Sequence, residues 1–154
     1  AFANGSPSEA PATMAAEMTP IVCVGEGLEV RQAGVHVADT PPQVDGSRAG
    51  VTPEQVADLV IAYEPVWAIG TGEVATPEDA QEVCAAIRER ISQTCGVQAG
   101  ESTRILYGGS VKAANVAALM AKPDVDGALV GGASLVAEEF AGIARFYNMP
   151  DLGA

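Results

Sequence analysis

One carboxylate, Glu64, stands where a catalytic base could work. It ends the apolar run LVIAYE (Leu59–Glu64), which predicts a buried strand that delivers the carboxylate to its carboxyl end. The residues behind it, PVWAIGTG (Pro65–Gly72), combine an apolar patch with glycines at the far end. Such a segment can close over a site, exclude water and bring backbone N–H groups to an anion. The stretch AYEPVWAIGTG therefore predicts a base beneath a lid.

Two further loops contain glycine pairs. YGGSV (Tyr107–Val111) leads into a helical pattern with Ser110 at its start, and VGGASL (Val130–Leu135) opens a short helix. Glycine lets the backbone approach a ligand closely, and free N–H groups at helix starts bind anions. Each pair alone is equally consistent with a tight strand-to-helix turn. Both pairs together, downstream of the predicted lid, indicate a phosphate site like those at the loops after the last two strands of parallel barrels.

A parallel sheet is expected to support these loops. Four short apolar runs have the pattern of strands buried on both faces, and each precedes a helical stretch. The four runs are PIVCV (Pro20–Val24), LVIAYE (Leu59–Glu64), RILYG (Arg104–Gly108) and DGALVG (Asp126–Gly131). Continuous apolar strands that alternate with helices predict an α/β fold built from βα units.

Five stretches carry helical patterns of unequal strength. They are Leu28–Asp39, Val51–Val60, Ala75–Gly96, Val111–Pro123 and Val136–Asn148. Thr52 and Thr76 are expected N-caps, because each precedes a proline at the first helical position and a capping-box residue. The helix that starts at Thr76 has the strongest pattern. Pro41 and Pro42 should break the first helix.

The composition fits one acidic domain. The chain has 154 residues, of which 48% are hydrophobic, and this is enough for a single core. A formal net charge of −12 argues against nucleic acid or an anionic membrane surface as a partner. The apolar runs are too short to span a membrane. An anionic substrate would need a local cluster of donors.

Cysteine usage indicates a reducing compartment. Cys23, Cys84 and Cys95 are an odd number without metal-ligand spacing, so they are expected to be buried free thiols. Free thiols fit the cytosol. The first residues lack the basic and apolar regions of a signal peptide. We therefore expect a cytoplasmic protein.

The first residues differ from the rest of the chain. Residues Ala1–Met18 are small and polar, are interrupted by Pro7 and Pro11, and show no clean period. MAAEM (Met14–Met18) could form the last turn of a helix, and the remainder is expected to be irregular or poorly ordered. The predicted organisation is an irregular segment over 1–18 and a single domain over 19–154.

The motifs together resemble one family. AYEPVWAIGTG with TPEDAQEV behind it, followed by YGGSV and DGALVGGASL, closely resembles the triosephosphate isomerase family. PIVCVGE (Pro20–Glu26) is similar to an earlier strand of that family. The resemblance runs from about Thr19 to Tyr147 and does not include Ala1–Met18 or the Pro41–Pro42 region. It implies a (β/α)8 TIM-barrel fold, of which only the last four βα units, a half-barrel, are visible here.

The resemblance implies roles for Glu64 and the segment behind it. Glu64 resembles the catalytic base, which moves a proton between adjacent carbons of a triose phosphate through an enediol(ate). Pro65–Trp67 and Glu73–Ala75 would be the two hinges of the lid. The implied lid residues are Pro65, Val66, Trp67, Ala68, Ile69, Gly70, Thr71, Gly72, Glu73, Val74 and Ala75.

Further residues match the family's site. Tyr107 is similar to the residue that latches the closed lid through its hydroxyl. Glu26 resembles a carboxylate near the open position of the lid tryptophan, Trp67. The substrate phosphate would be held by the backbone N–H groups of Gly70, Ser110, Gly131 and Gly132.

The implied reaction interconverts glycerone phosphate and glyceraldehyde 3-phosphate, in glycolysis and gluconeogenesis, without cofactor or metal. A complete member of the family is expected to be a homodimer, although its interdigitating loop belongs to the half that is not visible here. The electrophilic lysine and histidine of the family also come from that half. His36 is expected to be a solvated surface histidine, and Lys112 and Lys122 are expected on a helix. We therefore expect this chain alone to be nearly inactive.

Two other functions stay open. The chain could be a non-catalytic half-barrel that binds phosphates. It could also assemble with a second half-barrel, because four parallel strands leave two open edges and an uncovered apolar face.

Overall fold

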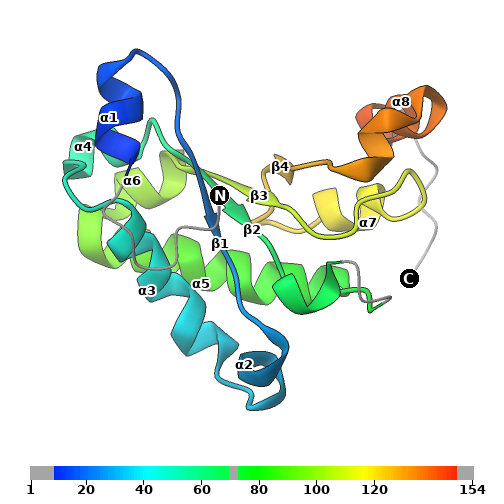
Figure 1. Ribbon diagram of the computed structural model, residues 1–154, viewed down its shortest axis with the longest axis horizontal. Helices are drawn as coiled ribbons and strands as arrows, with labels where there is room; N and C mark the ends of the chain where they lie inside the picture. Colours follow the sequence, from blue (N-terminus) through cyan, green and yellow to red (C-terminus); the bar gives the residue numbers. More distant parts are fainter. Residues whose placement is uncertain (1–8, 70–72, 149–154) are drawn as a thin grey trace.

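The fold is organised around a parallel sheet. A computed structural model describes residues 9–69 and 73–148 of the chain. In this part of the chain four parallel strands pair in the order β1-β2-β3-β4. Their bounds are Ile21–Val24 for β1, Val60–Tyr63 for β2, Arg104–Tyr107 for β3 and Gly127–Ala128 for β4. Figure 1 shows the sheet at the centre of the molecule with the long helix α5 running beneath it.

The strands are in register at the edge that carries the predicted site. Tyr63, the last residue of β2, lies level with Val24 of β1 and Tyr107 of β3. The residues that follow these three strands therefore leave the sheet side by side. Glu64, the glycine after β1 and the glycine pair after β3 consequently meet at one edge.

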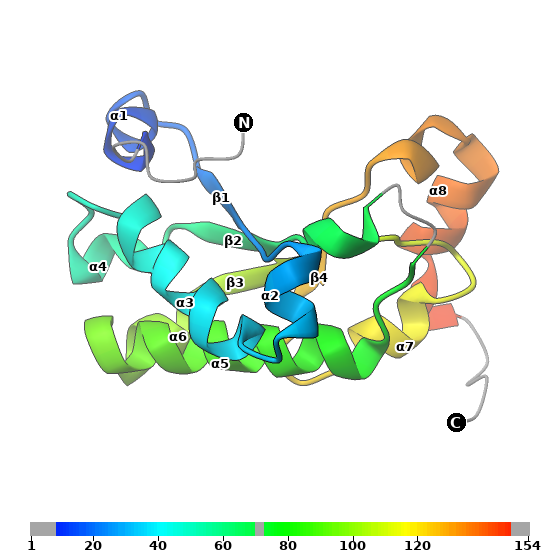
Figure 2. The same cartoon turned by 60° about the horizontal axis from the view of Figure 1, so that its bottom comes forward.

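Helices lie on both sides of the sheet but cover it unequally. Helices α3 and α5 contact each other and the strands, whereas α1 and α8 lie towards the two ends of the opposite side (Figure 2). The α-helices are α1 (Ala10–Ala15), α2 (Leu28–Gln32), α3 (His36–Ser47), α4 (Pro53–Val56), α5 (Pro77–Cys95), α6 (Val97–Ser102), α7 (Val116–Met120) and α8 (Ala137–Ala144). The 3-10 turns in the described residues are η1 (Val66–Ala68), η2 (Gly132–Leu135) and η3 (Phe146–Asn148).

The core lies between the sheet and α5. Ile61 and Tyr63 of β2 and Val83 and Ile87 of α5 are fully buried. All of β2 is buried, as predicted, but β1 and β3 alternate between buried and solvent-accessible residues. The expectation that every strand is buried on both faces is therefore wrong. In β1, Ile21 and Cys23 face the side opposite to the buried Val22 and Val24, and Ile21 is 49% exposed.

The predicted helix starts are confirmed. The Thr76 hydroxyl accepts a hydrogen bond from the Asp79 N–H at 3.1 Å, and the Asp79 carboxylate accepts one from the Thr76 N–H at 2.8 Å. Thr52 and Gln55 form the same reciprocal box at the start of α4. Such boxes satisfy N–H groups that have no partner within the helix.

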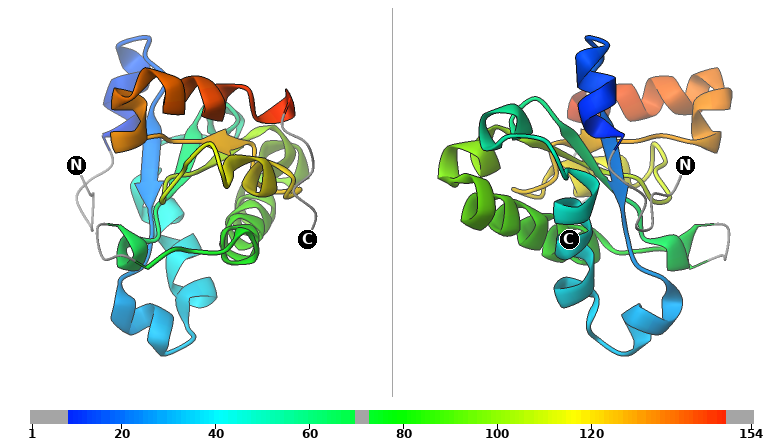
Figure 3. Two further views of the ribbon diagram at one scale, coloured as in Figure 1. Left: turned by 90° about the vertical axis from the view of Figure 1, so that its right-hand side faces the viewer. Right: turned by 60° about the vertical axis from the view of Figure 1, so that its left-hand side comes forward.

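The segment before β1 is partly helical, and its helix begins before the turn that was expected at Met14–Met18. Helix α1 occupies Ala10–Ala15, with Pro11 in its first turn. Proline is accepted there because the first N–H groups of a helix have no internal partner, and the alanines favour the helix. Residues 1–8 lie outside the described part of the chain. Figure 3 shows α1 at the amino end of β1, which lies at the edge of the sheet.

The region after β1 also differs from its prediction. Two helices, α2 and α3, replace the expected helix over Leu28–Asp39, and Gly34 between them has a positive φ of 70°. Pro41 and Pro42 lie inside α3 rather than ending it. The carbonyl groups that lose their N–H partners belong to Val37 and Ala38, which are exposed, so water can replace the missing bonds.

The cysteines are free, but only one is buried as expected. Cys84 is fully buried in α5, whereas Cys23 and Cys95 are half-buried. None of the described helices is both long and apolar enough to span a membrane.

Candidate active site

The position of Glu64 is set by backbone hydrogen bonds that continue beyond the strands. The Glu64 N–H donates to the Val24 carbonyl at 2.8 Å, and the Gly108 N–H donates to the Tyr63 carbonyl at 2.7 Å. Glu64 therefore follows β2 and lies between the ends of β1 and β3, where it is half-buried. This places the carboxylate at the carboxyl edge of the sheet.

Two glycines make room for Glu64. A Cβ on Gly25 would overlap the Glu64 carbonyl oxygen, and a Cβ on Gly108 would lie 2.7 Å from the Glu64 Cγ and 3.3 Å from its Oε1. Both approaches are too close for a side chain other than hydrogen. The absence of a Cβ at each neighbour therefore determines where the carboxylate can lie.

A pocket of about 390 Å³ contains the Glu64 carboxylate. Its lining residues are Cys23, Glu64, Ile69, Gly108, Leu129, Val130 and Gly131. Burial, and secondly the negative charge of Glu64, raise the pKa of the Cys23 thiol. The thiol beside the carboxylate is therefore kept protonated, and the two groups do not compete as charged neighbours.

A second pocket of about 590 Å³ lies at the loops after β3 and β4. It is lined by Ile69, Gly108, Gly109, Ser110, Val111, Lys112, Gly131, Gly132, Ala133 and Glu139. Within the described residues, the backbone N–H groups of Ser110, Gly131 and Gly132 donate no hydrogen bond. Three N–H groups without partners around one pocket suit an anion.

Side chains hold the two loops of this pocket in place. The Asn115 amide accepts the Lys112 N–H at 2.8 Å and donates to the Ser110 carbonyl at 2.9 Å. Glu139 of α8 accepts the Ala113 N–H at 2.7 Å, so it ties the loop after β3 to α8. The Ser134 hydroxyl donates to the Gly131 carbonyl at 2.7 Å.

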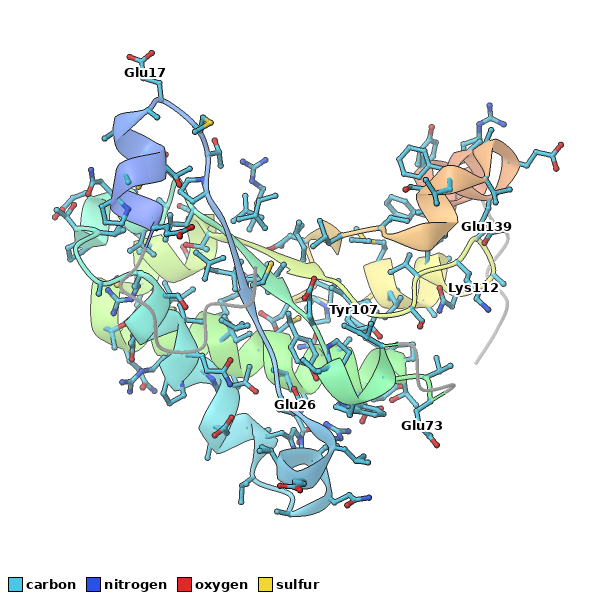
Figure 4. The ribbon with its side chains drawn as sticks, in the orientation of Figure 1. Glu17, Glu26, Glu73, Tyr107, Lys112 and Glu139 are labelled. Carbon is cyan, nitrogen blue, oxygen red and sulfur yellow. The ribbon has the colours of Figure 1, made fainter. Side chains whose placement is uncertain are left out.

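The first part of the predicted lid is held by Glu26. The Trp67 indole N–H donates to Glu26 Oε1 at 2.8 Å, and the Tyr63 hydroxyl donates to the same oxygen at 3.0 Å. The Arg31 guanidinium lies over the Trp67 ring, 5.2 Å from its centroid. Glu26 is only 1% exposed, and Figure 4 shows it near the carboxyl end of β1. The predicted contact between Glu26 and Trp67 is present, and its role in opening stays a prediction.

The remaining lid residues are only partly described. Pro65, Ala68 and Ala75 are buried, whereas Val66, Ile69, Glu73 and Val74 are exposed. Gly70, Thr71 and Gly72 lie outside the described residues. The predicted phosphate contact of Gly70 is therefore not located.

Tyr107 is buried at the end of β3 with its hydroxyl close to the start of the lid. A Cβ on Gly109 would overlap the Tyr107 hydroxyl and lie 3.0 Å from Pro65. Among the described residues this hydroxyl has no hydrogen-bond partner. Burial raises the pKa of Tyr107 to about 12, so the hydroxyl stays a neutral donor. Its role as a latch stays a prediction.

Known proteins match this chain over the region that contains these motifs. The chain matches the family model described as triosephosphate isomerase over residues 7–147. This chain belongs to the triosephosphate isomerase family. It is 63% identical to the triosephosphate isomerase of Cutibacterium acnes over 131 residues, which cover 85% of this chain and 51% of that protein. The triosephosphate isomerases of Streptomyces avermitilis and Mycobacterium avium are 60% and 56% identical, over 84% and 89% of this chain.

The match includes regions that the sequence motifs did not cover. The family model begins at residue 7, so most of the segment before β1 and the Pro41–Pro42 region belong to the triosephosphate isomerase match. The chain spans about half the length of the curated relatives it matches, 50% and 52% for those of Streptomyces avermitilis and Mycobacterium avium.

The predictions for three basic residues are corrected, and the first is that Lys122 follows α7, which ends at Met120, rather than lying on a helix. His36 is 9% exposed rather than solvated, and its Nε2 lies 3.0 Å from Glu82 Oε2 of α5. Lys112 lies in the loop after β3 and lines the larger pocket, because α7 begins only at Val116. The Lys112 carbonyl accepts the Asn115 and Val116 N–H groups in a turn that leads into α7, and the Asn115 side chain accepts the Lys112 N–H. The asparagine three residues after Lys112 is the feature of the sequence that could have indicated this hydrogen bond.

Among the described residues, no group of three or more His, Cys, Asp or Glu side chains could hold a metal ion.

Proposed function

We propose that this chain carries the base, the lid and the phosphate loops of a triosephosphate isomerase active site. One observation carries the proposal. The pocket that contains Glu64 and the pocket lined by Ser110 and Gly132 share Ile69, Gly108 and Gly131. A phosphorylated three-carbon substrate could therefore place its phosphate in one pocket and its reacting carbon beside Glu64. Because the chain belongs to the triosephosphate isomerase family, the substrate that we propose for these two pockets is a triose phosphate.

The proposed chemistry is a proton transfer. The Glu64 carboxylate removes a proton from the carbon next to the carbonyl of a triose phosphate, which leaves an enediol(ate). The same group returns the proton to the adjacent carbon and interconverts glycerone phosphate and glyceraldehyde 3-phosphate. The N–H groups of Ser110, Gly131, Gly132 and Gly70 hold the phosphate in this proposal. Closure of Pro65–Ala75 excludes water around the carboxylate.

The chain alone is expected to be nearly inactive. Charge that develops on the substrate oxygens needs a donor or a cation beside the reacting carbon. His36 contacts Glu82 and lines neither pocket. We propose that the four strands form half of an eight-stranded barrel, whose other half supplies the missing electrophile.

The test compares turnover with binding. We expect the purified 154-residue chain to show almost no isomerase turnover, while a glycolate-type phosphate analogue raises its Tm. Turnover comparable to a complete isomerase would contradict the first part. In a complete isomerase that contains both halves of the barrel, Glu64→Asp should lower kcat by about a hundredfold or more, while phosphate binding is largely kept. Equal loss of turnover and binding would contradict the assignment of Glu64 as the base.

A half-barrel that assembles with a second half is the other candidate. It is favoured by the exposed edge residue Ile21 and by the two open edges, β1 and β4, of the described sheet. Light scattering of the purified chain tests it, because a stable pair of halves doubles the mass. The proposal of a triosephosphate isomerase also includes a homodimer of the complete enzyme. It further includes a cytoplasmic location, which the free thiols support.

A further inference from the structure

Lys112 lies where sequence patterns did not place a functional residue. It lines the larger pocket together with Ser110, Gly131 and Gly132. Of the described residues that line this pocket, Lys112 is the one cation. Figure 4 shows Lys112 on the loop before α7 and Glu139 on the neighbouring segment of α8.

The ammonium of Lys112 is not used by another contact in the described chain. Most of the basic side chains form ion pairs, namely Arg31, Arg48, Arg88, Arg90 and Lys122. Lys112 forms no ion pair among the described residues, although the chain carries 20 acidic and only 8 basic residues. Its exposed side chain has a flexible four-carbon stem, so the charge can follow a ligand.

The pocket needs such a charge. The net charge of −12 repels an anion, and backbone N–H groups carry only partial charges. Two carboxylates are close, Glu64 in the adjoining pocket and Glu139 in the lining. The Glu139 carboxylate is held by the Ala113 N–H, which leaves Lys112 available to the pocket.

We propose that Lys112 is a further phosphate-binding residue, which adds a mobile cation to the neutral backbone donors of Ser110, Gly131 and Gly132. This inference rests on the proposed function, because it requires the larger pocket to hold a phosphate. Lys112 attracts and retains the phosphate group. It has no part in proton transfer, since it lines the larger pocket and not the one that contains Glu64.

The experiment measures binding of inorganic phosphate to the full chain by titration calorimetry, at low and at high salt. Lys112→Gln should weaken binding by about three- to tenfold at low salt, as the Coulomb energy of a doubly charged anion near one ammonium indicates. The loss should nearly vanish at about 1 M salt, where the Debye length is about 3 Å. Lys112→Arg, which keeps the charge, should bind within about twofold of the unmodified chain.

Arg104 provides a matched control. It begins β3, whereas Lys112 follows the other end of the same strand, and it also is exposed and forms no ion pair among the described residues. Arg104→Gln should leave phosphate affinity within about twofold. An equal loss in both Gln variants would show a general charge effect and overturn the inference.

The remaining outcomes separate the two proposals. Phosphate binding that Lys112→Gln leaves unchanged at low salt overturns the role of Lys112 and keeps the phosphate site. No phosphate binding by the unmodified chain overturns both the role of Lys112 and the proposed site.

Discussion

At the scale of single residues, the environment of Glu64 depends on what its neighbours lack. A Cβ at Gly108 would overlap the Glu64 side chain, and a Cβ at Gly25 would overlap the Glu64 backbone. Cys23 lies in the same pocket and stays protonated because burial and the Glu64 charge oppose the thiolate. The Cys23 thiol therefore reports on the charge of Glu64 without any substrate.

This coupling gives a pH-dependent prediction. The thiolate is the reactive form, so a raised pKa slows alkylation of Cys23 and moves its pH profile to higher pH. Glu64→Gln removes one cause of the shift and should move the profile to lower pH, with about a two- to fivefold faster reaction near pH 8. Iodoacetamide labelling followed by mass spectrometry measures the rate at each cysteine.

Cys95 is the internal control for this experiment. It is also half-buried, but it lies at the end of α5 and lines neither of the two site pockets. Its labelling rate should be the same in both proteins. A Cys23 profile that Glu64→Gln does not move would contradict the contact between the two groups.

At the scale of elements, the site is built where strands end and loops begin. The parallel register aligns Val24, Tyr63 and Tyr107, and backbone hydrogen bonds continue the alignment to Glu64 and Gly108. Helix α8 joins this edge through Glu139. Close packing of α8 is visible at Gly142, where a Cβ would lie 2.7 Å from the Ala113 Cβ. The geometry of the site is thus a property of neighbouring loops.

The space at Gly25 gives a stability prediction. Gly25→Ala places a methyl group against the backbone of Glu64, which cannot move without breaking its bond to Val24. We expect a loss of about 3 kcal/mol in the free energy of unfolding. Gly27→Ala is the matched control, because a Cβ there meets no atom within 4 Å. Urea unfolding measures both variants, and equal losses would contradict the packing argument.

The bond between Glu139 and Ala113 gives a second prediction at this scale. Glu139→Ala removes the acceptor that ties the loop after β3 to α8, and a hydrogen bond to a charged group is worth about 1.5–3 kcal/mol. Phosphate binding by Glu139→Ala should be about fivefold weaker than binding by Glu139→Gln, because both changes remove the negative charge but only Ala also frees the loop that carries Ser110. Titration calorimetry measures this loss.

Two variants control this measurement. Glu139→Gln retains an acceptor oxygen and should recover most of the binding. Glu138→Ala changes an exposed neighbour on α8 and should have no effect. Equal binding by Glu139→Ala and Glu138→Ala would show that the tie does not position the loops.

At the scale of the whole molecule, the sheet is covered on one side more than on the other. Val44 of α3, which contacts β1, and Val83 and Ile87 of α5, which contacts β2 and β3, are buried, while Ile21 on β1 remains 49% exposed. The described strands end in two edges, and unpaired edges favour association with other chains. The net charge of −12 opposes that association at low salt.

These features predict salt-dependent self-association. Light scattering should show larger particles as protein concentration and salt increase, because salt screens the repulsion. Ile21→Lys should lower the association constant about tenfold, since a lysine on an edge strand blocks pairing. Val97→Lys on α6 is the matched control, because Val97 is 66% exposed and lies outside the sheet. A monomer under all conditions would rule out the open edge as an interface.

Elements with local signals could be predicted from the amino-acid sequence. Capping boxes at Thr52 and Thr76 and the fully apolar β2 follow from residue types a few positions apart, so they could be predicted. The motif from Glu64 through the lid also identified the family, because its residues are contiguous. The glycine pairs predicted an anion site for the same reason.

Features that depend on contacts between distant residues could not be predicted and are known from the folded chain. Lys112 lies in a pocket and not on a helix because Asn115 and Glu139 bind its loop, and Glu139 is 27 positions further along the chain than Lys112. His36 is buried, and its Nε2 lies 3.0 Å from Oε2 of Glu82 on α5, a residue 46 positions further along the chain. Helix α3 continues through Pro41 because its exposed carbonyl groups can bind water. Such contacts leave no pattern in neighbouring residues, so they become visible only when the chain is folded.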